Sequence, residues 1–180
     1  MSRQPVDPGK VRNRLSWSLV GLLLLLTPLR DVSAAGGWIV RDDGIGPVKI
    51  GMTRSQLSAA LREKLVDEES GNDICFFVHA RGHDHVAFMI IDNRVVRIDI
   101  NAHGYKTSLG IQVGDSEAYA RRLYGPRMKV TGHQYIDTGH YLTVRSSDRR
   151  HGVRFETDSG KITMFYTGTY EAIQYVEGCE

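Results

Sequence analysis

Cysteine is scarce in this chain of 180 residues: only Cys75 and Cys179 occur. The chain therefore has no cysteine just after its N-terminal apolar stretch, where a bacterial lipoprotein carries its lipid. It also lacks a nucleophile elbow, a phosphate-binding loop, a zincin motif and a dinucleotide-binding fingerprint. These absences, together with the small size, argue against catalysis and against a cofactor, and we predict that the protein acts by binding.

The N-terminus has the pattern of a cleaved signal peptide. Basic residues precede an apolar run over residues 15–26, and the small residues of a cleavage site lie at 32–34. The run is shorter than the roughly 20 residues that cross a bilayer. We predict that residues 1–34 are removed and that the mature protein is periplasmic or secreted, without a stable membrane anchor. An uncleaved signal anchor is the alternative.

Most of the positive charge belongs to this leader. Residues 1–34 hold five of the 23 basic and two of the 21 acidic residues, so their removal changes the formal net charge from +2 to −1. A chain of that charge gives no reason to expect nucleic acid or an anionic membrane as a partner.

The two cysteines enter an oxidising compartment if the leader directs export, and an exposed free thiol is a liability there. We therefore predict one disulfide between Cys75 and Cys179, which would tie the C-terminal tail to the first half of the chain. A metal-binding pair or an intermolecular bridge is the competing interpretation.

A weak internal repeat divides the mature chain. The segment around Gly51 and Thr53 recurs about 63 residues later around Gly114 and Ser116. Such self-similarity indicates one supersecondary unit used twice. We predict a first helix-plus-sheet unit over residues 35–107 and a second over residues 108–180.

Each unit has the pattern of a short helix followed by strands. Thr53 is a predicted N-cap for a helix over 54–64, and Asp115 or Ser116 for a helix over 117–124. A hairpin turn is expected at Asp92-Asn93, with Ser159-Gly160 as its counterpart. Strands are expected over residues 74–79, 86–91, 94–100, 134–136, 141–145, 153–157, 162–167 and 172–176. The predicted fold class is α+β: two tandem repeats of a short helix followed by an antiparallel β-meander, with the helices on one sheet face.

The motifs that open and close the two helices carry a resemblance. Ile50-Gly51-Met52-Thr53 and Leu123-Tyr124-Gly125-Pro126 resemble the SmpA/OmlA family of small outer-membrane-assembly lipoproteins, whose unit places two helices before a three-stranded sheet. The tandem arrangement with a disulfide is similar to the related fold of the secreted beta-lactamase-inhibitor proteins. The chain differs from the first family in lacking the lipid-bearing cysteine, and from the second in its smaller number of cysteines. No functional residue is carried over from either.

Three histidines cluster near a predicted hairpin tip, at His79, His83 and His85. Together with Asp84 they have the residue types that bind Zn²⁺ or Cu²⁺. The alternative is a solvated turn in which Gly82 and Asp84 supply the turn chemistry. A second cluster, Ser146, Asp148 and His151, contains the residue types of a catalytic triad. Its close sequence spacing is more typical of a solvated turn.

Tyrosines crowd the last third of the chain, and tyrosine is enriched in protein-binding surfaces. The alternative is that these rings pack on the sheet. We predict a non-catalytic protein-binding module whose partner is an envelope component, an enzyme or a toxin. A periplasmic metal-binding protein is the second hypothesis and a small hydrolase the third. The candidate binding surface comprises Tyr135, Tyr141, Tyr166 and Tyr170.

Overall fold

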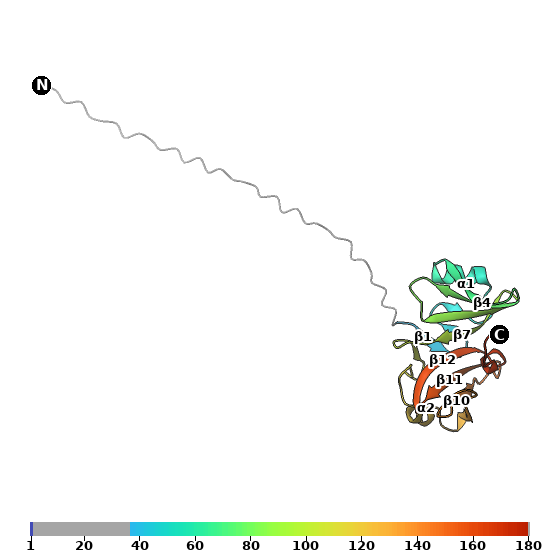
Figure 1. Cartoon of the computed structure of the whole chain (residues 1–180). Helices are drawn as coiled ribbons and strands as arrows, with labels where there is room; N and C mark the ends of the chain where they lie inside the picture. Colours follow the sequence, from blue (N-terminus) through green and yellow to red (C-terminus); the bar gives the residue numbers. More distant parts are fainter. Residues whose placement is uncertain (2–36, 180) are drawn as a thin grey trace. The chain divides into compact units, whose positions relative to one another are not determined.

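An eight-stranded antiparallel sheet forms the centre of the fold, with strand order β4-β5-β6-β7-β12-β11-β10-β9 (Figure 1). The computed structural model describes Met1 and residues 37–179, so the predicted signal peptide lies outside the described residues apart from Met1. β7 and β12 pair in the middle of the sheet and join the first four strands to the last four. The strands are β4 (Leu65–Gly71), β5 (Cys75–Ala80), β6 (Val86–Ile91), β7 (Arg94–Ile100), β9 (Met128–Gly132), β10 (His140–Arg145), β11 (His151–Asp158) and β12 (Lys161–Thr169).

Two short α-helices accompany this sheet, α1 (Arg54–Leu61) and α2 (Glu117–Tyr124), which confirms the predicted α+β class. A 3₁₀ turn, η1 (Gly125–Arg127), follows α2, and a second, η2 (Ala172–Gln174), lies near the C-terminus. α1 ends three residues before the predicted position because Arg62 adopts a left-handed conformation. None of the helices in the described part of the chain is long and apolar enough to cross a membrane.

A second, four-stranded sheet is made of strands too short for sequence periodicity to reveal. Its order is β3-β2-β1-β8, and β1 and β8 run parallel. Gly46 in its hairpin has φ 50°, and a Cβ there would lie 2.7 Å from the Trp38 ring, so the turn requires glycine. The strands are β1 (Ile39–Arg41), β2 (Gly44–Ile45), β3 (Val48–Lys49) and β8 (Lys106–Thr107).

The hydrophobic core lies on one face of the large sheet. Alternate residues of each strand contribute to it, for example Phe88 and Ile90 of β6, while Leu57 of α1 and Ala120 of α2 pack against them. All four are fully buried. The opposite face of the sheet is therefore formed by the other alternate residues.

Several strand predictions require correction. Residues 134–136 lie in the loop between β9 and β10 rather than in a strand, and residues 172–176 contain η2. Two edge strands, β4 and β9, were not predicted, because each carries polar residues where a buried strand would be apolar. Sequence patterning finds buried strands more easily than exposed edges.

The chain enters the two helices through the same contacts. Gly51 N donates to Val95 O and Val95 N donates to Met52 O, both at 2.8 Å. In the second half Gly114 N donates to Ile162 O at 2.8 Å, and Ile162 N donates to the carbonyl of the next residue, Asp115, at 2.9 Å. In each half, therefore, the strand after the hairpin turn holds the residues that precede the helix.

The helix N-caps give the first testable prediction. Thr53 Oγ1 accepts from Gln56 N and the Gln56 side chain accepts from Thr53 N at 2.9 Å, a complete capping box. Thr53→Ala should lower the free energy of unfolding by about 1 kcal/mol, and Ser116→Ala should do the same for α2. Urea denaturation measures both, with Thr131→Ala on β9 as the control. Unchanged stability in both cap variants would contradict this account of the helix starts.

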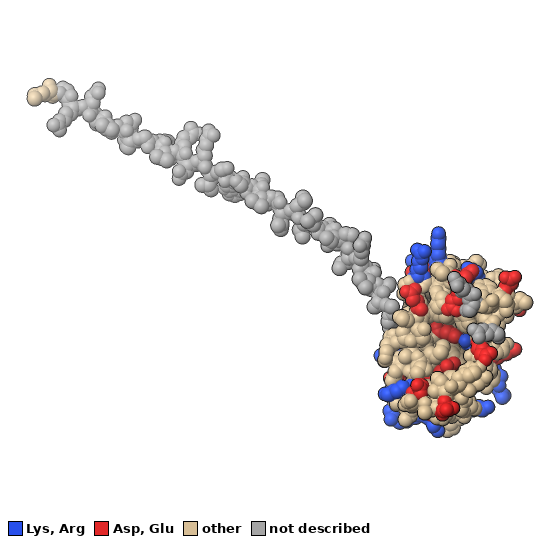
Figure 2. All heavy atoms as spheres, viewed as in Figure 1, with Lys and Arg blue, Asp and Glu red and all other residues tan. Residues whose placement is uncertain are grey.

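Charge is distributed unevenly over the face seen in Figure 2. Asp and Glu side chains are spread over this face, several of them across its middle, whereas Lys and Arg lie mainly toward its two ends. The basic side chains therefore form no continuous patch over the described residues on this face.

Candidate functional site

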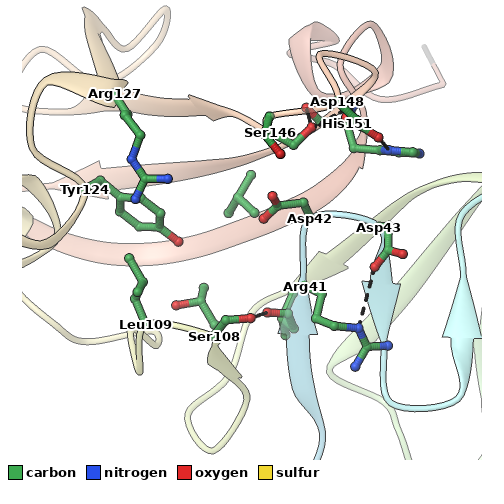
Figure 3. A pocket seen from close by; sticks show the side chains of 14 residues that line it. Arg41, Asp42, Asp43, Ser108, Leu109, Tyr124, Arg127, Ser146, Asp148 and His151 are labelled. Atoms are coloured by element: carbon green, nitrogen blue, oxygen red, sulfur yellow. Dashed lines mark hydrogen bonds and ion pairs between the residues drawn. The ribbon is translucent and has the colours of Figure 1, made fainter.

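A cavity of about 420 Å³ opens between segments that are far apart in the sequence. Its walls come from residues 40–43, from the loop after β8, from the α2–η1 junction and from the β10–β11 turn (Figure 3). Its volume lies within the range of small-molecule sites in proteins.

Ser146, Asp148 and His151 line this cavity but do not form a triad. Asp148 binds both partners: it accepts from Ser146 Oγ, and its Oδ2 lies 2.7 Å from His151 Nδ1. Ser146 Oγ donates to the backbone carbonyl of His151 at 2.8 Å, and no contact between the Ser146 hydroxyl and the imidazole ring occurs among the described residues. A triad needs the imidazole between the hydroxyl and the carboxylate, so Ser146 has no general base here.

The electrostatics of Asp148 fit a structural turn. The hydrogen bond from Ser146 holds the pKa of this carboxyl well below its usual range, and bonds from the backbone of Arg150 and from His151 act in the same direction. Asp148 therefore stays ionised and orders the β10–β11 turn.

The three histidines of the predicted metal site do not converge. His79 pairs with Glu68, His85 Nδ1 lies 3.1 Å from Asn101 Oδ1, and His83 stacks on the Trp38 ring at a centroid distance of 4.2 Å. Trp38 packs against the core, whereas His79 and His85 line a hollow on the opposite face of the sheet. No group of three metal-ligating side chains occurs among the described residues. The prediction that His79, His83 and His85 bind one metal is therefore wrong.

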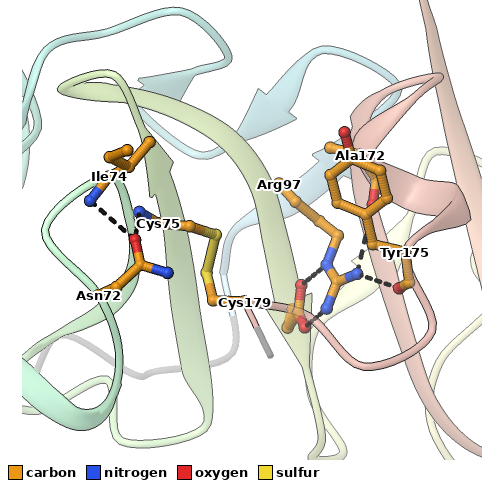
Figure 4. Close-up of a disulfide and its surroundings, with 8 residues drawn as sticks. Asn72, Ile74, Cys75, Arg97, Ala172, Tyr175 and Cys179 are labelled. Carbon is orange, nitrogen blue, oxygen red and sulfur yellow. Dashed lines mark hydrogen bonds and ion pairs between the residues drawn. A yellow bond between two sulfur atoms is a disulfide. The ribbon is translucent and has the colours of Figure 1, made fainter.

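The C-terminal strap, defined as residues 170–179, crosses the sheet face opposite the core. η2 within it lies against β7, β11 and β12. Cys179 at its end is disulfide-bonded to Cys75 on β5, with a Cα–Cα distance of 5.3 Å (Figure 4). This is the pairing that the sequence predicts, and it ties the strap to the first half of the sheet.

Arg97 on β7 holds the middle of the strap. Its Nη1 donates to Tyr175 O at 2.7 Å and to Ala172 O at 3.3 Å, as Figure 4 shows. Its Nε and Nη2 donate to the two carboxylate oxygens of Asp99, both at 2.7 Å, and its guanidinium lies 4.4 Å from the centroid of the Tyr166 ring. Burial opposes the charged form, but the adjacent Asp99 carboxylate outweighs it and raises the pKa of Arg97.

Arg154 on β11 also binds the strap, two strands further along the sheet. Its Nη1 donates to Ile173 O at 3.1 Å and to Gln174 O at 3.4 Å, and its Nε donates to Thr143 Oγ1 at 2.9 Å. Its guanidinium stacks over the Tyr141 ring at 4.6 Å. Two buried guanidinium groups thus bind four consecutive carbonyls, those of residues 172–175.

The strap changes the interpretation of the tyrosines. Tyr141 and Tyr166 are 4% and 1% exposed, so the prediction that they belong to an exposed binding surface is wrong. Their rings lie beneath the guanidinium groups that hold the strap. Tyr170 is half-buried under Arg145, whose guanidinium carbon lies 4.1 Å from the centroid of the Tyr170 ring. Tyr135 alone of the four predicted residues is exposed, at 59%.

Sequence reasoning missed Arg97 and Arg154. The available signal was the alternation of charged and apolar residues in Arg97-Ile98-Asp99-Ile100, where the two isoleucines have the spacing of core residues. That pattern predicts a side chain on the sheet face opposite the core. It does not predict what the guanidinium binds there, because the strap carbonyls are 75 to 78 residues away in the sequence from Arg97.

No protein family model and no curated protein matches the chain. Two solved structures are similar to it, each at 12% identity and a TM-score of 0.47. One is an extracellular protein containing a SCP domain from Bacillus anthracis; the match covers 69% of this chain and 45% of that one, so the chain spans less than half of its length. The other is the uncharacterized protein yfeY from Escherichia coli, where the match covers 72% of this chain and 99% of that one.

Proposed function

We propose that this is an exported, non-catalytic protein that binds another protein through the surface around its C-terminal strap. We define the strap surface as Ile74, Tyr135 and Tyr175. These side chains are 64%, 59% and 37% exposed, although each is large and apolar or aromatic. The partner class is an envelope component, an enzyme or a toxin.

The observation that carries this proposal is that two exposed tyrosines, one on the strap and one bonded to it, lie at a firmly held segment. Tyr175 belongs to the strap, the Tyr135 hydroxyl donates to Glu177 of the strap, and Ile74 precedes the cysteine that anchors it. A rigid tyrosine buries a large area on binding at low conformational entropy cost, which is why tyrosine is common at binding hot spots.

Export rests on the signal-peptide pattern and agrees with the disulfide. N-terminal sequencing of the protein from expressing cells should find that the mature chain begins after Ala34 or Ala35, because both positions satisfy the small-residue rule for cleavage. A chain that still begins at Met1 and sediments with the inner membrane would contradict export.

The architecture is proposed to be two copies of one helix-plus-sheet unit, as in the SmpA/OmlA and beta-lactamase-inhibitor folds that the sequence resembles. Two features support it. The residue before each helix is held by the strand after the hairpin turn, and the turns Asp92-Asn93 and Ser159-Gly160 both have positive φ angles. The paired helices and strands follow one another in the same order in the two halves.

Site-specific photo-crosslinking tests the binding surface. A photoreactive phenylalanine analogue placed at position 135 or 175 should crosslink one specific protein in an envelope extract. The same analogue at exposed Thr163, on β12, should not. Crosslinking from position 163 alone, or from none of the three positions, would contradict the proposal.

The recovered partner then allows affinities to be measured. Tyr135→Ala and Tyr175→Ala should each weaken binding by more than about 1 kcal/mol, the threshold that marks an anchoring residue. The matched variants Tyr135→Phe and Tyr175→Phe keep the ring and should retain most of the affinity. Full affinity in both alanine variants would mean that the partner does not bind through Tyr135 and Tyr175.

A further inference from the structure

The cavity of about 420 Å³ carries two charged side chains of opposite sign that form no ion pair among the described residues. Asp42 makes no side-chain hydrogen bond or ion pair among the described residues, whereas its neighbour Asp43 pairs with Lys49 at 2.7 Å. Arg127 makes no side-chain hydrogen bond or ion pair within the described part of the chain, and its guanidinium carbon lies 5.7 Å from the centroid of the Tyr124 ring. Both side chains line the cavity and come from different segments.

The walls between the two charges are partly apolar. Figure 3 shows the Asp42 carboxylate and the Arg127 guanidinium on different walls, with the Tyr124 ring on the Arg127 side. Leu109, 41% exposed, adds an apolar side chain at the cavity wall. The remaining apolar lining residues are Val40 and Val153.

From this arrangement we infer that the cavity binds a small zwitterion with an apolar substituent, such as a free aliphatic amino acid. The ammonium group lies at Asp42, the carboxylate group at Arg127, and the apolar substituent against Leu109 and Tyr124. An arginine can bind a carboxylate through two parallel hydrogen bonds, and such charge-assisted bonds are about twice as strong as neutral ones.

The surroundings of Asp42 favour a cationic group beside it. Burial raises the pKa of Asp42, and the neighbouring carboxylates of Asp43 and Asp148 raise it further, against the opposing effect of Arg127 and His151. A bound ammonium would offset this concentration of negative charge. This inference concerns a site different from the strap surface and does not depend on the partner proposed for that surface.

Saturation-transfer NMR on the purified full chain tests the inference, with the twenty amino acids as probes. Transfer is expected to the aliphatic amino acids, and isothermal titration with L-leucine should then give a saturable, one-site isotherm. Isopentylamine, which lacks the carboxylate, and 4-methylpentanoate, which lacks the ammonium, should each bind at least about tenfold more weakly. L-leucyl-L-leucine distinguishes a free amino acid from a short peptide as the source of the two charges.

Neutral variants locate the site. Asp42→Asn and Arg127→Gln should each weaken L-leucine binding by about tenfold or more, the effect of losing one charge-assisted contact. Asp137→Asn and Lys129→Gln, exposed charges that do not line the cavity, should leave it unchanged. Circular dichroism verifies that each variant is folded. The inference is overturned if no amino acid shows transfer, or if L-leucine binds the two cavity variants as well as it binds the unmodified chain.

Discussion

Cys179→Ser is expected to lower the free energy of unfolding by up to about 4 to 5 kcal/mol, the chain-entropy value for a loop of about 100 residues. The disulfide closes a sequence separation of 104 residues, so its loss frees most of the exported chain in the unfolded state. Urea denaturation of the oxidised protein and of the variant measures the difference. Addition of a dithiol reductant to the unmodified chain should reproduce it.

The same variant should also loosen the strap. Hydrogen exchange over residues 170–179 is expected to become faster in Cys179→Ser, while exchange in β6 and β7 changes little when measured well below the unfolding transition. Cys75→Ser should behave identically, since either change breaks the same bond. Equal stability of the oxidised chain and both serine variants would contradict the role assigned to the disulfide.

Arg97→Met is expected to lower the free energy of unfolding by about 3 to 5 kcal/mol, because it leaves the carboxylate of Asp99 buried without its partner. The Arg97 and Asp99 side chains are 5% and 13% exposed, so water cannot replace the guanidinium well. The variant also removes the donor that binds Ala172 O and Tyr175 O. Urea denaturation measures the effect, with Arg122→Met on the exposed side of α2 as the control.

Two further measurements separate the effect of the unpaired Asp99 carboxylate from the effect of the other contacts that Arg97→Met removes. Arg97→Met combined with Asp99→Asn should recover a substantial part of the lost stability, because no unpaired carboxylate remains. The loss of unfolding free energy in Arg97→Met should also be smaller at pH 4 than at pH 7. Burial raises the pKa of Asp99, so without Arg97 the native state is penalised as the pH rises above the ordinary carboxyl range. If the loss of stability in Arg97→Met were independent of pH, the unpaired carboxylate of Asp99 would not be its cause.

Local signals in the sequence predicted the helices and the interior strands. Thr53 and Ser116 were identified as N-caps because capping depends on residues within one turn. The edge strand β4 was missed because residues such as Asp67 and Glu68 have no apolar alternation. The path of residues 172–176 was also missed, because hydrogen bonds from Arg97 and Arg154 hold this segment in place and its own sequence pattern does not determine its conformation.

The candidate sites were harder to predict because they also depend on contacts between residues that are far apart in the sequence. Alternation in β12 places Phe165 and Tyr166 on opposite faces of the sheet, but it cannot show that the strap covers one of those faces. The grouping of Ser146, Asp148 and His151 was correctly interpreted as a turn, because three such residues within six positions constrain one another locally. The juxtaposition of Asp42 and Arg127 has no sequence signature.

Hydrogen exchange of the chain with and without its crosslinked partner tests the central claim most directly. Binding through the strap surface predicts that the partner slows exchange in residues 133–136 and 170–179. It also predicts little change in residues 40–43 and 146–151, which line the cavity. Protection confined to the cavity segments, with the strap exchanging as fast as in the free chain, would contradict the account.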